Sequence, residues 1–535
     1  MRPGDKGRAV VVGAGVAGLA TAALLAREGY DVEVLEQRDE VGGRAGTWET
    51  AGFRFDTGPS WYLMPEIFDH FFALLGTSAD AELDLVRLDP AYRAWFESGA
   101  EPLELRSDAD DSVARFEAVE PGAGGRLRRY LASARDTTEL AREHLLYSTF
   151  ESLPRLLTPA VLRRAGRLLP LVLQTLDRYV ARRFGDERLR RVLGYPAVFL
   201  GTAPDRAPAL YHLMSHADLA DGVLYPQGGF GTVVDALLRL AVREGATVRT
   251  GARVVGILTT TSRTPAPSAQ VSGVQYLDEH GHEHVARADV VVGAGDLHHL
   301  ETSLLPPDLR TYPAEWWARR DPGPGAVLVH LGVRGRVPEL THHTLVFAAD
   351  WQANVDAIFG PDRRVPEPAS MYVCAPSRTD ATVAPPDSEN LFLLVPVPAD
   401  VTLGGGGDPV VEQVADAAIH RLGHVVGIPD LADRVMVRRT VGPADFARDL
   451  SSWSGGALGP AHVLRQSAWW RGRNASAKVG GLLYAGGSTI PGVGLPMCLI
   501  SAELAVKRLR GDRSSGPLPT PLTPSVRTAP ARGSR

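Results

Sequence analysis

Cysteine and lysine are scarce in this sequence. The two cysteines, Cys374 and Cys498, lie far apart and show no metal-ligand spacing, so we expect neither a disulfide framework nor a metal site. The only lysines are Lys6, Lys478 and Lys507, which leaves most of the positive charge to arginine. The motifs G-x-S-x-G and H-E-x-x-H are also missing, which argues against nucleophilic acyl transfer and zinc hydrolysis.

A strong net charge and long apolar runs are lacking as well. Lys plus Arg number 57 and Asp plus Glu 62, a formal net charge of −5, so we expect no nucleic-acid partner. No apolar run approaches the roughly 20 residues that span a bilayer, and any membrane contact should be peripheral. The first residues lack the pattern of a secretory signal, so we expect a cytoplasmic protein. The length of 535 residues predicts two associated units with room for a large cavity.

A dinucleotide-binding turn is predicted near the start of the chain. The apolar run RAVVV leads into Gly13, Gly15 and Gly18, and the helix-forming run LATAALLARE follows. Gly13 permits a tight turn, Gly15 lets a pyrophosphate approach the helix N-terminus, and Gly18 lets helix and strand pack closely. The next apolar run, VEVLE, ends at Glu36, whose carboxylate can accept hydrogen bonds from ribose hydroxyls. Strand, turn, helix and acid together predict a nucleotide cofactor.

A second glycine motif directly after this unit carries a family resemblance. The stretch EVGGRAGTWETAGFRFDTGPSW resembles the second glycine motif of the flavoproteins that include amine oxidases, protoporphyrinogen oxidases and carotenoid desaturases. The resemblance implies FAD as the cofactor, with Gly42, Gly43 and Arg44 beside its pyrophosphate. Paired glycines admit a close backbone approach, and an arginine can offset phosphate charge.

A third glycine-rich segment lies near the other end. Residues 482–485 read as a strand, Gly486 and Gly487 allow close backbone approach, and a helix is expected from Pro496. The segment LLYAGGSTIPGVGLPMCLISAEL is similar to the C-terminal signature of bacterial phytoene desaturases, and the resemblance spans roughly residues 8 to 509. It implies a helix N-terminus that faces the flavin and stabilises negative charge there.

The expected cofactor contacts come from these segments and from a strand around Val254, which the resemblance places beside the adenine. They are Gly13, Gly15, Gly18, Glu36, Gln37, Gly42, Gly43, Arg44, Gly58, Pro59, Ser60, Val254, Gly486, Gly487, Gly494, Pro496 and Met497.

The predicted fold class is α/β, a Rossmann-like FAD-binding domain of the GR2 flavoprotein type with an inserted α+β substrate domain and a helical membrane-facing region. The FAD-binding domain is expected in three parts, at residues 1–100, 222–300 and 450–509. The helical region is expected at 101–221, the substrate domain at 301–449 and a disordered tail at 510–535.

The family resemblance implies an FAD-dependent carotenoid desaturase that converts phytoene towards lycopene by successive removal of a hydride and a proton. Because the flavin accepts the hydride, the protein must position the polyene, exclude water and handle a proton. The candidate proton-handling residues are Asp296, His342, His343 and Asp350. A His pair beside a strand is also common in a hydrogen-bonded core, and Asp296 can cap a helix.

Other functions stay open. An amine oxidase of the same superfamily usually places a Lys near the flavin, and no Lys lies between Lys6 and Lys478. A lipid-binding escort protein on this scaffold would need no complete flavin site. Carotenoid isomerases, ketolases and later-step desaturases share the motifs. No sequence motif indicates whether the electron acceptor is oxygen or a membrane quinone.

A membrane-facing surface is expected in residues 155–184, which hold seven Arg, one acid and many Leu and Val. This composition suits helices that lie on a bilayer surface, although core helices with a solvated Arg face would share it. The family resemblance favours attachment to the inner face of the cell membrane, where a long polyene would be dissolved.

Overall fold

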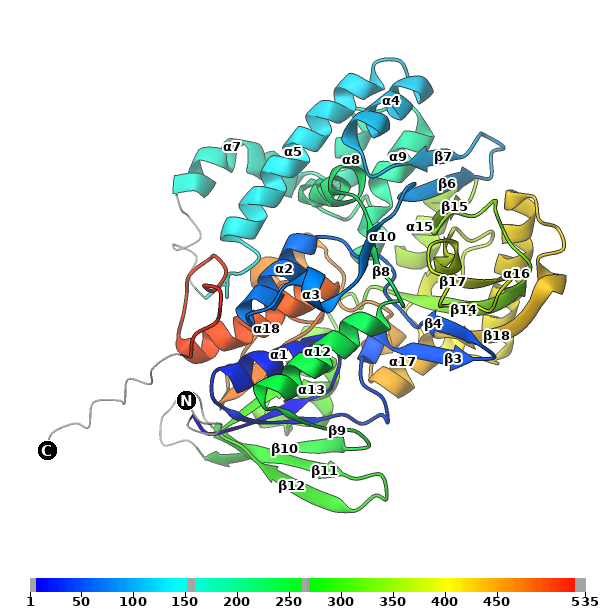
Figure 1. Cartoon of the computed structure of the whole chain (residues 1–535). Helices are drawn as coiled ribbons and strands as arrows, with labels where there is room; N and C mark the ends of the chain where they lie inside the picture. The colour runs from blue at the N-terminus through cyan, green and yellow to red at the C-terminus, as the bar shows by residue number, and fades with distance from the viewer. Residues whose placement is uncertain (1–5, 152–158, 262–266, 268, 525–535) are drawn as a thin grey trace, which may run out of the picture.

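The computed structural model describes residues 6–151, 159–261, 267 and 269–524 (Figure 1). A five-stranded parallel sheet forms the centre of the cofactor unit, and its strands come from the three predicted segments. Their spatial order is β20 (Leu482–Tyr484), β13 (Val290–Gly293), β1 (Arg8–Val12), β2 (Asp31–Leu35) and β9 (Thr247–Arg249). Apolar runs such as those of β1 and β13 form these strands because both faces of a parallel sheet are covered.

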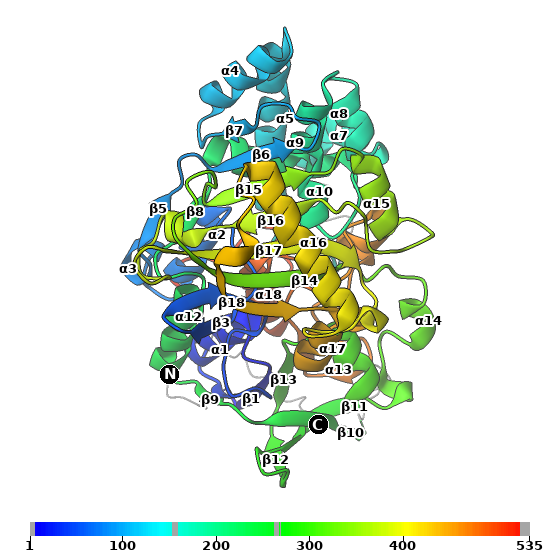
Figure 2. The ribbon, with the colours of Figure 1, turned by 90° about the vertical axis from the view of Figure 1, so that its right-hand side faces the viewer.

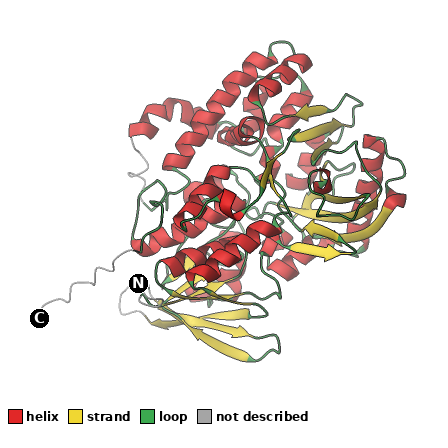
Figure 3. Ribbon diagram, in the orientation of Figure 1, coloured by secondary structure: helices red, strands yellow, loops and turns green. Residues whose placement is uncertain are grey.

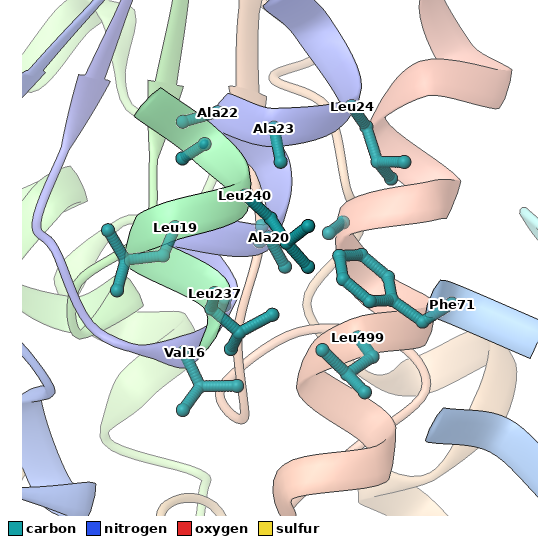
Figure 4. Close-up of a cluster of buried hydrophobic side chains, with 14 of the residues drawn as sticks. Val16, Leu19, Ala20, Ala22, Ala23, Leu24, Phe71, Leu237, Leu240 and Leu499 are labelled. Atoms are coloured by element: carbon teal, nitrogen blue, oxygen red, sulfur yellow. The ribbon is translucent and has the colours of Figure 1, made fainter. Parts of the chain in front are cut away.

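Helices cover one face of this sheet, and a second sheet covers the other. The helices are α1 (Val16–Arg27), α2 (Pro65–Leu74), α12 (Gly231–Glu244) and α18 (Leu495–Arg510). Figure 4 shows their shared core, where Leu24, Phe71, Leu237, Leu240 and Leu499 gather around the alanines of α1. The second sheet contains β10 (Arg253–Thr261), β11 (Ala269–Leu277) and β12 (Glu283–Arg287), joined by β19 (Val479–Gly480).

The substrate unit is built on a seven-stranded mixed sheet. Its spatial order is β18 (Val435–Val441), β14 (Pro324–Arg334), β17 (Ser388–Pro398), β16 (Met371–Cys374), β15 (His343–Phe347), β6 (Tyr92–Phe96) and β7 (Leu103–Leu105). The long helix α16 (Pro409–Val426) covers the outer face (Figure 2) and buries a core of Val, Leu and Ile. The opposite face is turned toward the interior of the molecule.

Helices gather at the far end of the substrate unit (Figure 3). They include α4 (Ala109–Val119), α5 (Ala123–His144), α7 (Pro159–Leu173), α8 (Leu176–Ala181), α9 (Glu187–Gly194) and α10 (Pro196–Phe199). Part of the predicted membrane-facing stretch, 152–158, lies outside the described residues. Among the helices that the structure describes, we find none with the length and apolar character needed to cross a bilayer.

One expected domain boundary is wrong. The prediction assigned residues 1–100 to the cofactor unit, but β6 pairs with β15 and belongs to the substrate sheet. The short strand β5 (Leu85–Arg87) pairs with β8 (Leu224–Pro226), so the chain leaves the cofactor sheet well before residue 100. The sequence of a short apolar strand does not indicate which strand it pairs with. The two paired strands here are separated by some 250 residues, and such pairing leaves no local sequence pattern.

The expected disordered tail needs a second correction. Residues 511–524 pack against the cofactor unit, with Leu518 4% and Leu522 2% exposed. The amide of Leu522 donates to the carbonyl of Leu74, and the buried Lys507 ammonium donates to the carbonyls of Ser514 and Gly516. Two leucines were too few to show periodicity, yet both belong to the buried core that α18 shares. Residues 525–535 lie outside the described residues.

Candidate functional site

A cavity of about 1820 Å³ lies between the two units. The β1–α1 turn, the β2 end, the loop before α18 and the inner face of the substrate sheet contribute to its lining. Of the predicted cofactor residues, only Gly18 is absent from the lining. The structure therefore gathers residues from positions 13 to 497 around one space.

The first glycine turn has the shape that phosphate binding requires. Gly13 has a φ of +100°, which favours glycine, and Gly15 caps α1 with no side chain to occupy its first amides. A Cβ at Gly18 would lie 1.9 Å from the carbonyl oxygen of Gly13, so only glycine lets the helix pack this close to the turn. The free amides of α1 face the cavity as an anion-binding site.

Two polar side chains after β2 line this end of the cavity. The buried Glu36 carboxylate accepts hydrogen bonds from the amides of Ala14, at 2.7 Å, and Arg38, at 3.0 Å. Gln37 donates from Nε2 to the carbonyl of Asp449 at 3.0 Å. Val254 lines the cavity from the neighbouring strand β10. Glu36 thus stabilises the glycine turn and also lines the cavity.

The second glycine motif packs directly against the first. Gly42 has a φ of +110° and forms a backbone bridge with Gly15. Arg44 lines the cavity, but it also donates from Nε to the carbonyl of Ala457 at 3.0 Å and from a terminal nitrogen to Ser452 Oγ at 2.9 Å. Its guanidinium therefore links the motif to the loop that follows α17 (Pro443–Leu450), a role that the sequence did not indicate.

The loop before α18 forms the opposite lip of the cavity, where Gly486, Gly487, Gly494, Pro496 and Met497 lie. The N-terminus of α18 has no side-chain cap, so its first amides are available to a ligand, as at α1.

Two buried residues that sequence reasoning missed support this loop. Arg471 donates to the carbonyl oxygens of Thr489 and Gly487, at 2.9 and 2.6 Å. His462 Nε2 accepts the amide of Val493 at 3.2 Å, and burial, reinforced by the charge of Arg471, holds its pKa well below the usual range. The only sequence feature that could have drawn attention to these two residues is the position of Arg471 directly after two tryptophans in QSAWWRGRN.

The other end of the cavity is largely apolar and aromatic. Its lining includes Trp61, Phe199, Leu210, Leu213, Met214, Leu328, Tyr372 and Leu394. Trp61 and Phe199 lie with ring centroids 5.7 Å apart, and the phenol of Tyr372 is 2.7 Å from Ser60 Oγ. We call Trp61, Phe199 and Tyr372 the aromatic wall. An apolar cavity end of this kind suits a ligand without polar groups.

The four candidate proton-handling residues do not come together. Asp296 lines the cavity, and its carboxylate caps α13 (Leu297–Ser303) by accepting the amides of His298 and His299. Asp350 is exposed and caps α15 (Trp351–Phe359), and it is absent from the lining. His342 and His343 are buried behind the aromatic wall, also outside the lining. Only Asp296 has the position that the prediction requires.

The cavity contains no ammonium group from the residues that the structure describes, because its lining includes no Lys. Lys6 instead pairs with the buried Glu28 at 2.5 Å, and Lys507 is held by backbone carbonyls. The feature expected of an amine oxidase is therefore not found in this lining.

Comparison with known proteins agrees with this geometry. The model of the flavin containing amine oxidoreductases matches residues 16–510. The chain is 38% identical over 502 residues to a carotenoid 3,4-desaturase of Haloarcula japonica, covering 94% of this chain and 98% of that protein. It is 37% identical over 506 residues to a zeta-carotene-forming phytoene desaturase of Myxococcus xanthus, covering 94% and 93%.

Solved structures share the fold. An oxidoreductase of Methanosarcina mazei has a TM-score of 0.59 at 15% identity, covering 94% of this chain and 100% of that one. A putrescine oxidase bound to putrescine has a TM-score of 0.59 at 17% identity, covering 95% and 98%. At these identities the likeness shows the fold alone.

The residues present fit FAD. Two uncapped helix N-termini and three glycine-rich segments border the cavity, and Glu36 lies at the end of β2 as a ribose-binding acid would. The chain binds FAD and belongs to the flavin containing amine oxidoreductase family, within which it groups with the carotenoid desaturases.

Proposed function

We propose that the protein is an FAD-dependent desaturase of carotenoid biosynthesis that converts phytoene towards lycopene. The observation that carries the proposal is one continuous cavity with glycine turns at one end and an aromatic wall at the other. Bound FAD supplies the hydride acceptor for the CH–CH unit. The similarity to a carotenoid 3,4-desaturase supports a second candidate substrate, a later carotenoid that already has a long conjugated system.

The chain's own residues position the polyene and exclude water. Leu328 and Leu394 line the cavity from the substrate sheet, while Phe199 and Met214 close it from the helical side. Apolar contact of this kind holds a hydrocarbon by shape and burial, because it has no group to hydrogen-bond. For the proton, we favour Asp296, which lies in the cavity lining.

An anaerobic turnover experiment tests the proposal. Purified FAD-loaded protein is mixed with phytoene in liposomes, and flavin bleaching is followed together with polyene absorption. We expect bleaching with new long-wavelength bands, and re-oxidation by added quinone or oxygen then identifies the electron acceptor. An unchanged flavin with phytoene but bleaching with a later carotenoid would select the second candidate. A colourless protein that binds polyene would indicate an escort protein.

We further propose that α7 attaches the protein to the inner face of the cell membrane, where the polyene is dissolved. Leu162, Leu169 and Leu173 are 55, 59 and 71% exposed, and their spacing places them on one side of the helix. Arg163 and Arg167 are exposed beside them, and α7 has no acidic residue. Exposed leucines flanked by arginines suit an anionic bilayer surface.

Vesicle sedimentation tests this attachment. The double substitution Leu169→Glu and Leu173→Glu should lower the affinity of the protein for anionic vesicles by ~10-fold or more. The substitution removes apolar contact with the bilayer, and the added carboxylates repel the anionic headgroups. The matched control is Val242→Glu, at another exposed apolar position (54%) on α12. Equal binding of both variants would contradict a role for α7.

A further inference from the structure

Three side chains with metal-binding atoms converge behind the aromatic wall. His343 on β15 lies directly opposite Cys374 on β16 in the antiparallel ladder, and His342 precedes β15. One ligand atom from each of the three lies within 4.8 Å of the others. The three residues are 4% exposed or less. We call His342, His343 and Cys374 the buried triad.

A hydrogen bond holds each imidazole ring of the triad in place. His342 Nδ1 lies 2.8 Å from Thr379 Oγ1, and His343 Nδ1 lies 2.7 Å from the Tyr372 hydroxyl. The Nε2 atoms of both histidines are buried, and neither has a hydrogen-bond partner among the described residues. Buried polar atoms without a partner are rare in folded proteins, and a bound ion is one of the occupants that explain them. When a histidine binds a metal, its other nitrogen commonly makes such a bond to the surrounding protein.

Metal binding at the buried triad exchanges the thiol proton for the ion. The Cys374 thiol would release one proton to solvent as one metal–sulfur bond forms, and each histidine would supply the lone pair of one ring nitrogen.

The ligand set selects the class of ion. Two imidazole nitrogens and one sulfur match the preferences of Zn²⁺, whereas Mg²⁺ and Ca²⁺ need oxygen ligands that the triad does not supply. We propose that His342, His343 and Cys374 bind one Zn²⁺ ion behind the aromatic wall. Because His343 stacks on Trp61 at a centroid distance of 4.4 Å and bonds Tyr372, the ion braces two residues of the wall.

X-ray absorption at the zinc edge tests the proposal on the FAD-loaded full-length protein after incubation with Zn²⁺ alone. We expect about one ion per chain, with one sulfur at about 2.3 Å and nitrogens at about 2.0 Å from the zinc. The exposed hairpin with His282, His284 and Asp278 could also bind Zn²⁺, so a His284→Ala background removes that contribution. The sulfur shell is diagnostic, because the hairpin has no cysteine.

Two variants identify the sulfur. Cys374→Ser should lose the sulfur shell, whereas Cys498→Ser, at the only other cysteine, should keep it. If Cys374→Ser fails to fold, the spectra of the parent and of Cys498→Ser still decide the question. A parent spectrum with only nitrogen and oxygen shells, or a sulfur shell lost in Cys498→Ser, would overturn the proposal.

Discussion

At the cofactor end of the cavity, backbone amides and glycines form most of the binding surface, in contiguous strand–turn–helix units such as residues 8–27 and 482–510. At the other end, side chains from distant elements form the surface, with Trp61, Phe199 and Tyr372 meeting from three parts of the chain. A pyrophosphate can be held by amides at a helix N-terminus, whereas a hydrocarbon is held only by the shape of an apolar wall. The two ends should therefore respond differently to substitution.

Gly18→Val should have the largest effect, because a Cβ at this position would lie 1.9 Å from the carbonyl of Gly13. Moving the helix from the turn should reduce the free energy of unfolding by ~4 kcal/mol or more and abolish FAD binding. Soluble yield and the flavin absorbance of the purified protein measure both. The control is Gly125→Ala in α5, where nothing lies within 4 Å of the added Cβ. This substitution should leave the free energy of unfolding equal to that of the parent or slightly higher. A yellow, stable Gly18→Val variant would contradict the close-packing role.

Glu36→Ala should weaken FAD binding by ~10- to 100-fold while the protein still folds. The substitution leaves the buried amide of Ala14 without its acceptor, a penalty of about 1–3 kcal/mol, and removes the acid at the end of β2. Titration of the apoprotein with FAD measures the dissociation constant. Glu101→Ala, at an exposed position, is the control. Unchanged affinity in Glu36→Ala would show that backbone contacts alone hold the cofactor.

Trp61→Ala tests the opposite end, where we expect FAD affinity to stay near that of the parent. Turnover of the polyene should fall by ~10- to 100-fold, because the cavity loses the ring that contacts Phe199 and His343. Trp61→Phe should recover part of the rate, and Trp470→Ala, at a residue 54% exposed, should have no effect. Loss of FAD from Trp61→Ala would show that the two ends are not independent.

Asp218→Asn should have the smallest effect, and only at higher pH. The buried Asp218 lies behind the wall, where it accepts the hydroxyls of Tyr195 and Tyr92, and burial raises its pKa to about 7. Between about pH 4 and pH 7 the folded state therefore binds more protons than the unfolded state, so the free energy of unfolding falls as the pH rises.

Asn cannot ionise, so Asp218→Asn should flatten this dependence and raise the midpoint of thermal unfolding by about 2–4 °C at pH 8 relative to the parent. At pH 4 the two proteins should differ little. Thermal unfolding between these pH values measures the effect, with the exposed Asp110→Asn as control. A constant difference at all pH values would contradict the raised pKa.

Sequence patterns predicted the cofactor end because each unit there is local. The strand before Gly13, the helix after Gly15 and the acid at Glu36 lie within 30 residues. Their spacing in the sequence is set by the geometry of the strand–turn–helix unit. The same holds for the strand, glycines and helix between 482 and 510. These units indicated the fold class, the cofactor and the family.

Tertiary structure alone decided the rest. His343 and Cys374 showed no metal-ligand spacing, yet the register of β15 against β16 places them together. The tail after residue 510 lacked periodicity, yet Leu518 and Leu522 are buried, and β6 pairs with β15, which begins some 250 residues later. The physical reason is the same in each case. A local motif forms its contacts between residues that are close in sequence, so its spacing can be recognised. Strand pairing and the packing of the aromatic wall join residues that are far apart in sequence, and their sequence separation says nothing about their distance in space.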